Sequence, residues 1–388
     1  MKKTSQTYQV VIVGGGAVGL FLGICLQRAG IDCLILEQLK QVREGSRSLG
    51  IHPVSLELFQ NTGIVSPFLD EGITISNGHA FANRRKLGTL SFDDCPKPFN
   101  FILALPQNRT ETILEQQLHA INSQVLERGA TVTDISQSDK KVQVSYQKEG
   151  QTVTANADFL VGCDGKDSFV RQETNITFEG SAYPDTYIMG DFSDNTDLGN
   201  DAAIYLCDAG LVESFPLANN RRRWVIKTSD YCSSVNRAAI EKRLWARLKH
   251  DLTGTENTML SSFGVQKLVA STMVNNRIIL AGDAAHVVSP IGGQGMNLGW
   301  LGAWDLAENL SAIFESKSDS RSILQQFDQR RSRAAQTAIR RAEMNMRLGR
   351  SANIPSIRNG LVWMMLNTPL SQLMARLFTM RGIERWPV

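Results

Sequence analysis

The sequence has few of the residues and runs on which several classes of protein depend. Only six of its 388 residues are cysteine and none forms a C-x-x-C pair, which argues against a disulfide framework and against a zinc site. No uninterrupted apolar stretch of 18 residues occurs, so no membrane-spanning helix is expected. Lysine and arginine exceed aspartate and glutamate by only three (41 against 38), too few for a nucleic-acid-binding protein of the histone kind. These absences predict a cytoplasmic globular protein with no metal site.

Signals for targeting and for three common catalytic sites are missing as well. The apolar stretch from Val10 is broken by three glycines and no A-x-A-like cleavage site follows, so we expect no targeting segment. The five histidines form no H-x-x-x-H pair, Gly165-Lys166-Asp167 lacks the rest of a P-loop, and no G-x-S-x-G elbow is present. What the chain does have is 31 glycines, and nine of them fall in three clusters at 14–19, 162–165 and 292–295. Each of these clusters follows an expected strand.

The first cluster stands in a complete strand–loop–helix unit. Residues 8–13 are rich in β-branched side chains and predict a buried strand, and G-x-G-x-x-G follows at Gly14, Gly16 and Gly19. In such a loop the first glycine permits a tight turn, the second lets a pyrophosphate approach the backbone, and the third lets helix and strand pack closely. Glu37 ends the next expected strand, 18 residues after Gly19, where it can accept hydrogen bonds from a ribose. The unit predicts dinucleotide binding and does not distinguish NAD from FAD.

The other two clusters favour FAD. Residues 157–162 predict a strand that ends in an Asp164-Gly165 turn, a common turn that is often only structural. Residues 277–281 predict a strand that delivers Asp283 at its carboxyl end, where α/β sheets bind ligands. The loop 290–295 then opens a helix expected at about 295–314, and the start of that helix can stabilise negative charge. Reduced flavin carries such a charge, whereas an enzyme that binds only a nicotinamide has no evident need for a second glycine-rich helix start.

Together the three motifs resemble the class A, single-component FAD-dependent monooxygenases related to para-hydroxybenzoate hydroxylase, over nearly the whole chain. Residues 105–111 look like the family's segment beside the flavin, and Arg47 looks like its flavin-contacting arginine. The resemblance implies an NAD(P)H-consuming enzyme that uses FAD and O2, with either NADH or NADPH as the electron donor. It implies hydroxylation of a phenolic or polyketide-like aromatic small molecule through a flavin C4a-hydroperoxide.

The resemblance also assigns residues. Asp283 is expected to bind the ribityl hydroxyls, Asp164 to lie near the FAD and to assist NAD(P)H, and Pro290 to face the substrate. The residues expected to bind the cofactor are Gly14, Gly16, Ala17, Val18, Gly19, Glu37, Gln38, Arg47, Gln107, Asp164, Gly165, Gly282, Asp283, Gly293, Gly295, Met296 and Asn297. Those expected to support catalysis are Arg47, Pro290, Gly293 and Gly295.

Between residues 187 and 227 the pattern changes to short alternating strands with a hairpin at 218–220, which predicts a mostly antiparallel sheet. Such a sheet can roof a pocket over the flavin. Its expected inward residues are candidate substrate contacts, although packing within the sheet is the simpler explanation for each: Tyr187, Asp191, Tyr205, Glu213 and Phe215, with Pro290 from the loop below.

The expected fold is therefore α/β. It consists of a Rossmann-like FAD-binding domain of the GR2 type, an inserted, mostly antiparallel substrate sheet and a C-terminal helical region. The expected FAD-binding domain is discontinuous (1–75, 100–175 and 265–345), as is the substrate domain (76–99 and 176–264), and the C-terminal helices occupy 346–388.

The arginine-rich segment after residue 321 is expected to be the solvated face of a helix over the FAD-binding domain. The stretch 361–378 is amphipathic and is expected to cap the pocket or to pack on a neighbour, with weak peripheral membrane contact as the minor alternative. We expect a monomer or homodimer that binds no nucleic acid. Two rival functions remain open: a flavin-dependent epoxidase or reductase acting on an isoprenoid or quinone precursor, and a flavin-binding module without turnover.

Overall fold

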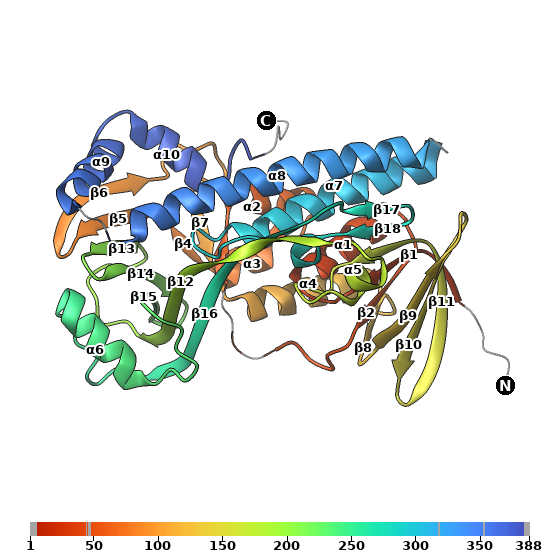
Figure 1. Cartoon of the computed structure of the whole chain (residues 1–388), viewed down its shortest axis with the longest axis horizontal. Coiled ribbons are helices and arrows are strands. Elements are labelled where there is room, and N and C mark those ends of the chain that lie inside the picture. The colour runs from red at the N-terminus through yellow and green to blue at the C-terminus, as the bar shows by residue number, and fades with distance from the viewer. Residues whose placement is uncertain (1–5, 44, 46–47, 317–318, 352–353, 384–388) are drawn as a thin grey trace.

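Two large β-sheets lie at opposite ends of the molecule, and one long helix, α8 (Ser320–Gly349), runs from one to the other (Figure 1). A computed structural model describes residues 6–43, 45, 48–316, 319–351 and 354–383. The observed architecture is the expected α/β class with an added sheet and C-terminal helices.

The first sheet is built around a buried parallel core. Strand β1 (Gln6–Val13) lies between β2 (Cys33–Glu37) and β11 (Gln151–Gly162), parallel to both. Val10, Val11 and Ile12 have no exposed surface, as expected for a strand covered on both faces. The sheet is completed by β8 (Leu126–Arg128), β9 (Thr131–Gln137), β10 (Val142–Lys148), β17 (Val274–Asn275) and β18 (Ile278–Leu280).

Helices cover this sheet, and two of them begin directly after glycine-rich loops. Helix α1 (Ala17–Arg28) begins directly after the first loop, and α7 (Gln294–Ser316) begins directly after the third. The indole Nε1 of Trp300 donates a 2.9 Å hydrogen bond to the carbonyl of Ala17, which fixes the starts of these two helices against each other. The long helix α8 (Ser320–Gly349) lies beside α7, and the remaining helices of this region are α2 (Pro53–Asn61), α3 (Val65–Glu71), α4 (Gln107–Ile121) and α5 (Phe169–Glu173).

The second sheet has the strand order β19-β16-β12-β15-β14-β13-β5-β6, and all of its pairs are antiparallel except β13 with β5. Its hairpin turns at Asn219 and Asn220, which both have positive φ (61° and 51°), the geometry that favours asparagine in tight turns. Helix α6 (Arg237–Leu248) packs on one face of this sheet. The strands are β5 (Asn77–Ala82), β6 (Arg85–Ser91), β12 (Phe178–Ser193), β13 (Ala202–Cys207), β14 (Gly210–Leu217), β15 (Arg221–Thr228), β16 (Asn257–Ala270) and β19 (His286–Val287).

A small three-stranded sheet lies between the two large ones. It joins β3 (Gly50–Ile51), β4 (Ile73–Ile75) and β7 (Ile102–Ala104). Strand β3 lies directly before α2, and Gly50 and His52 are hydrogen-bonded to Asn297 near the start of α7. Strands β3, β4 and β7 and the start of α7, which are far apart in the sequence, therefore meet there.

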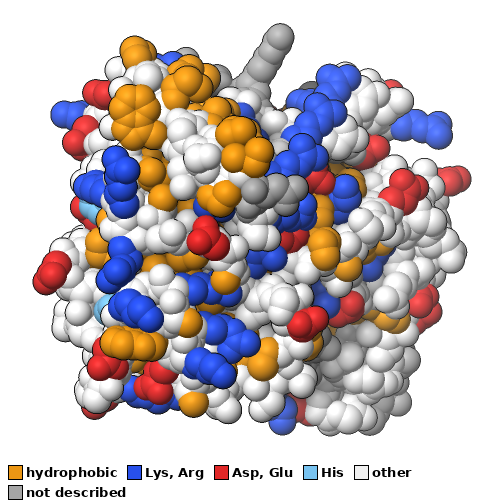
Figure 2. All heavy atoms as spheres, turned by 60° about the vertical axis from the view of Figure 1, so that its left-hand side comes forward, with side chains coloured by type: hydrophobic (Ala, Val, Ile, Leu, Met, Phe, Trp, Pro, Cys, Tyr) orange, Lys and Arg blue, Asp and Glu red, His pale blue; other side chains and the backbone are white. Residues whose placement is uncertain are grey.

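The C-terminal helices α9 (Pro355–Asn367) and α10 (Leu370–Phe378) pack on β6, at the end of the second sheet far from β1 (Figure 1). Apolar side chains gather on the outer face of this helix pair (Figure 2), and the most exposed of them are Ile354, Ile357, Leu361, Trp363, Met364, Leu370 and Leu373. In the described residues, no helix has both the length and the apolarity to cross a membrane.

One expectation for the C-terminal part needs correction. The basic segment after residue 321 is not wholly a solvated face, because the side chains of Arg331 and Arg358 are buried (2% and 8% exposed). The expected boundaries at 264/265 and 345/346 fall inside β16 and α8, two continuous elements. The division into domains stays a prediction.

Candidate active site: a glycine-lined groove beside an apolar pocket

The loop after β1 depends on two glycines for different reasons. Gly14 has φ +106°, and a Cβ there would lie 2.4 Å from the carbonyl oxygen of Cys163, so the fold itself requires glycine. Gly16 caps α1 without a side-chain hydrogen bond, and among the described residues the only heavy atom within 4 Å of a Cβ there would be Glu111 Oε1 at 3.8 Å. The space at Gly16 is therefore open, as an anion-binding helix start requires, although the carboxylate of Glu111 accepts a hydrogen bond from Ala17 N–H at this helix start. A Cβ at Gly19 would lie 2.0 Å from the carbonyl oxygen of Gly14, so α1 and the loop pack in close contact.

Glu37 is buried at the end of β2 and already has two partners in the protein. Its Oε2 accepts a 2.6 Å hydrogen bond from Gly15 N–H, and its Oε1 accepts a 2.7 Å bond from Leu39 N–H. Each carboxylate oxygen has a second lone pair, so hydrogen bonds from ribose hydroxyls remain possible. The neighbouring Gln38 is exposed.

The Asp-Gly turn lies directly behind the first loop. Asp164 Oδ1 accepts a 2.6 Å hydrogen bond from Ser168 Oγ, and Oδ2 accepts a 3.0 Å bond from Val170 N–H, so the carboxylate fixes the start of α5. Burial raises the pKa of Asp164, partly offset by these bonds. Gly165 has φ +83° and no atom within 4 Å of a Cβ, which leaves its backbone open.

Asp283 lies in a short 3-10 turn (Gly282–Ala284) that follows β18. Although the residue is exposed to the groove, desolvation by the surrounding atoms raises the pKa of its carboxyl to about 6. Gly282 is needed beside it, since it has φ +59° and a Cβ there would lie 3.1 Å from Val18. Because β1, β11 and β18 are adjacent and parallel, the loops that carry Gly14, Asp164 and Asp283 lie side by side at their carboxyl ends.

The start of α7 is held by Asn297, whose side chain is saturated within the protein. Its Oδ1 accepts bonds from His52 N–H (2.8 Å) and Ser55 Oγ (2.7 Å), and its Nδ2 donates to the carbonyls of Gly50 (2.9 Å) and Gly293 (2.7 Å). Asn297 is completely buried, and its side chain holds the loop in place; the expected contact of this residue with the cofactor stays a prediction. A Cβ at Gly295 would meet nothing within 4 Å, and Met296 is half-buried beside it.

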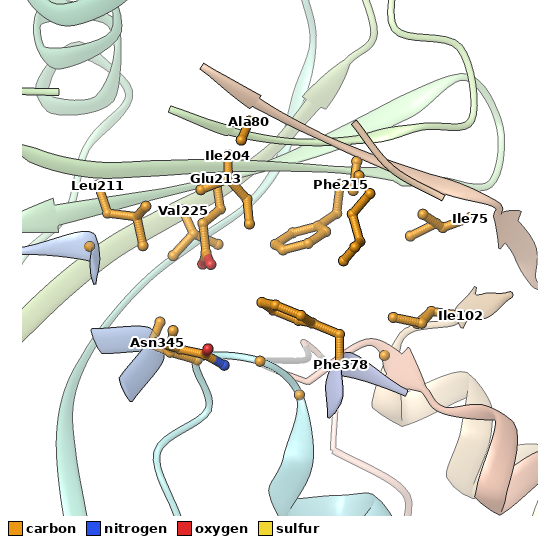
Figure 3. A pocket seen from close by; sticks show the side chains of 18 of the residues that line it. Ile75, Ala80, Ile102, Ile204, Leu211, Glu213, Phe215, Val225, Asn345 and Phe378 are labelled. Atoms are coloured by element: carbon orange, nitrogen blue, oxygen red, sulfur yellow. The ribbon is translucent and has the colours of Figure 1, made fainter. Parts of the chain in front are cut away.

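An apolar cavity of about 250 Å³ lies between the loop 290–293 and one face of the second sheet (Figure 3). That face presents every second residue of its strands, because side chains alternate along a strand. Figure 3 shows the carboxylate of Glu213 pointing into the cavity toward Asn345, and the rings of Phe215 and Phe378 on the cavity's two sides. The lining is largely aliphatic and aromatic, and Pro290 and Gly293 belong to it.

Three expected substrate contacts from the sheet do not line this cavity. Tyr205 is on the opposite face, where its ring stacks on Phe81 at 4.8 Å, so the expectation that it points inward is wrong. Tyr187 is buried in a stack with Phe263 at 5.2 Å. Asp191 is bound by the guanidinium of Arg223 through bonds of 2.7 and 2.8 Å. Glu213 and Phe215 are the two candidates from the sheet that do reach the cavity.

Several residues of the site escaped the sequence analysis. His52 lines the cavity with Nε2 3.1 Å from the carbonyl oxygen of Gly292, and burial lowers its pKa to about 4, so the ring is neutral near pH 7. Asn345 and Phe378 reach the cavity from α8 and α10, elements that only the tertiary structure brings there. Glu111 lies beside Gly16 and accepts a 2.8 Å hydrogen bond from Gln107 Nε2. The side-chain amide of Gln107, the expected neighbour of the flavin, therefore already has a partner in the protein.

The expected flavin-contacting residue Arg47 lies outside the described residues.

These features fit an extended dinucleotide. The open backbone at Gly16, Gly165 and Gly295 forms a cradle that added Cβ atoms would fill, and two carboxylates, Glu37 and Asp283, lie along it where hydroxyl groups could be bound. The loop 290–293 lines the cavity and leads directly into the start of α7 at Gln294, beside the open backbone of Gly295, so a ligand held along these loops can present its far end to the cavity.

Comparison with known proteins agrees with this geometry. Residues 7–342 match the family model described as "FAD binding domain". An uncharacterized aromatic compound monooxygenase (YhjG) of Bacillus subtilis strain 168 is 32% identical over 349 residues, which are 88% of this chain and 68% of that protein. The chain therefore belongs to the FAD-binding family of class A FAD-dependent aromatic hydroxylases, and FAD is the cofactor of this family.

Solved structures share the whole architecture. The p-nitrophenol 4-monooxygenase PnpA of Pseudomonas putida DLL-E4 superposes with a TM-score of 0.88 at 21% identity, over 98% of this chain and 100% of that one. The anhydrotetracycline hydroxylase OxyS of Streptomyces rimosus gives 0.83 at 27% identity, over 99% of this chain and 78% of that one. The chain spans between 56% and 68% of the length of the curated relatives that it matches.

Proposed function

We propose that the chain is an FAD-dependent, NAD(P)H-consuming monooxygenase that hydroxylates a phenolic or polyketide-like aromatic small molecule. The observation that carries this proposal is that the loop 290–293, which leads into the start of α7, also lines the apolar cavity. A cavity of about 250 Å³ suits a small molecule, near the lower end of ligand sites at about 300 Å³. Similar proteins named as monooxygenases or hydroxylases of aromatic compounds, such as pentachlorophenol 4-monooxygenase of Sphingobium chlorophenolicum and the anhydrotetracycline hydroxylase OxyS, support hydroxylation over the epoxidase or reductase alternative.

In this proposal the protein binds, orients and excludes water, while bound FAD supplies the redox chemistry and the activation of O2. The open backbone at Gly16, at the start of α1, would hold the pyrophosphate, and Asp283 would accept hydrogen bonds from the ribityl chain. The start of the 23-residue helix α7 stabilises negative charge where the groove meets the cavity. Asn297 keeps that loop in place, and the apolar walls keep water away from the reacting ring.

The test is oxidation of NADH and of NADPH by the FAD-loaded protein, with and without a panel of phenols and polyketide precursors. We expect an aromatic ligand to stimulate oxidation and the product to contain oxygen from labelled O2. A product formed equally well without O2 would identify a reductase instead. Oxidation that no aromatic compound stimulates or couples to product would contradict the hydroxylase.

The proposal includes a cytoplasmic monomer or homodimer that binds no nucleic acid and is not inserted in a membrane. The six free cysteines support a reducing compartment. The exposed apolar side chains on α9 and α10 support association of two copies, which light scattering of the purified protein would detect. Weak peripheral membrane contact through the same side chains is the alternative, and co-sedimentation with vesicles tests it.

A further inference from the structure

The cavity contains one carboxyl group, that of Glu213, that no described residue binds. Glu213 is only 6% exposed, and in the described part of the chain no hydrogen bond or ion pair reaches its carboxyl. Figure 3 shows that carboxyl pointing into the cavity and not into the sheet. A buried carboxyl without a partner costs stability, so its position calls for a ligand that donates a hydrogen bond.

The place of Glu213 follows from the register of the sheet. Glu213 pairs with Val225 and with Ile204, and Val225 pairs with Met189, so one row of side chains crosses the cavity face. The other members of this row are apolar and line the cavity. Glu213 therefore stands in the middle of an apolar wall, and the surrounding desolvation raises its pKa to about 7.

The cations near Glu213 are already committed to other carboxylates. On one side, Arg223 binds Asp191 through two hydrogen bonds. On the other side, Lys227 lies 3.2 Å from Asp185, and Arg350 binds the same carboxylate.

The remaining titratable groups that face the cavity or flank Glu213 supply no free positive charge either. His52 is neutral at pH 7, and His79 has Thr89 and Asp201 as partners, each at 3.0 Å. The hydroxyl of Tyr187 is buried, with a pKa raised by burial and by Glu213.

We propose that Glu213 accepts a hydrogen bond from the hydroxyl group of an uncharged phenol, and that the cavity therefore selects neutral phenols over aromatic carboxylates. An aromatic carboxylate would bring a second negative charge into an apolar cavity in which, among the described residues, every cation is already paired. This inference rests on the proposed function, because it takes the cavity to be the substrate site.

Equilibrium binding tests the inference without turnover. Calorimetric titration of the oxidised holoenzyme, without NAD(P)H, would compare para-cresol with para-hydroxybenzoate and para-ethylphenol with para-hydroxyphenylacetate. We expect each neutral phenol to bind about 10- to 100-fold more tightly than its carboxylate, the effect of one hydrogen bond to a charged group. In Glu213→Gln this preference should disappear, while Glu256→Gln, an exposed glutamate before β16 with an 84% exposed side chain, should keep it.

The wild-type protein gives a second measurement that needs no variant. Between pH 8 and pH 6 the carboxyl of Glu213 takes up a proton, so the affinity for neutral phenols should fall and that for aromatic carboxylates should rise. A holoenzyme that binds carboxylates as well as phenols, or binds neither, would overturn the inference. So would a Glu213→Gln protein that keeps the wild-type preference. Hydroxylation of a carboxylate would refute the inference and leave the proposed function intact, whereas phenol binding without any oxygenated product would do the opposite.

Discussion

The backbone N–H of Gly15 donates a 2.6 Å hydrogen bond to the carboxylate of Glu37, and this bond ties the glycine loop after β1 to the end of β2. The acid that the G-x-G-x-x-G pattern places near a ribose thus also holds the loop that receives the pyrophosphate. One residue then affects both the cofactor and the fold, and the two effects can be separated by measuring the protein with and without FAD.

Glu37→Ala should destabilise the FAD-free protein as well as weaken FAD binding. The buried N–H of Gly15 and the partly buried N–H of Leu39 lose their acceptor, and each hydrogen bond to a charged group contributes about 1.5–3 kcal/mol. Urea denaturation of the apoprotein measures the change in free energy of unfolding, and Gln38→Ala, at the exposed neighbour, is the control. Unchanged stability in Glu37→Ala would mean that the loop does not depend on this carboxylate.

Gly14→Ala and Gly16→Ala should fail in different ways. At Gly14 the positive φ and the 2.4 Å approach to Cys163 make any Cβ a steric clash, so the variant should not fold into a stable protein. At Gly16, where φ is −81° and the space is open, the variant should fold with a normal melting temperature. Its Cβ would nevertheless occupy the place of the pyrophosphate, so FAD affinity should fall at least about tenfold, by analogy with a lost charge-assisted hydrogen bond. A Gly16→Ala protein that binds FAD like the wild type would show that the phosphates lie elsewhere.

Asp283→Asn should lose FAD and yet be more stable than the wild type when both are free of cofactor. An unfolded aspartate has a pKa of about 3.9, whereas that of Asp283 in the fold is about 6. Because the folded pKa is the higher one, ionisation of Asp283 disfavours the folded state from about pH 4 upward, with no further change above about pH 6. The melting temperatures of the two apoproteins should therefore agree near pH 4, and the variant's should be higher at pH 7. A wild-type protein that is the more stable of the two at pH 7, or a yellow Asp283→Asn or Asp283→Ala protein, would contradict this account.

The sequence predicts the groove better than the cavity, for a physical reason. The residues of the groove are close together in the sequence. Gly14, Gly16 and Glu37 belong to one strand–helix–strand unit, so their spacing in the sequence predicts how they are arranged in space. The cavity is not local, because Asn345 and Phe378 reach it from helices that begin more than 100 residues after Phe215. Within the sheet, β13 has apolar side chains on both faces, since α6 covers one face and the cavity lies against the other. Because polar and apolar residues do not alternate along β13, the sequence does not indicate which face of the sheet Tyr205 lies on.

Phe215→Ala and Tyr205→Phe test that assignment of faces. The ring of Phe215 lines the cavity, so its removal should raise the KM for an aromatic substrate about two- to tenfold, the range expected for the loss of one aromatic contact. Tyr205→Phe keeps the stack on Phe81 and removes only a hydroxyl on the opposite face, so KM and kcat should both stay at wild-type values. Steady-state kinetics of the two holoenzymes with the same substrate provides the comparison. If KM rose in Tyr205→Phe and not in Phe215→Ala, the substrate would lie on the α6 face of the sheet, and the cavity beside the loop 290–293 would not be the site of reaction.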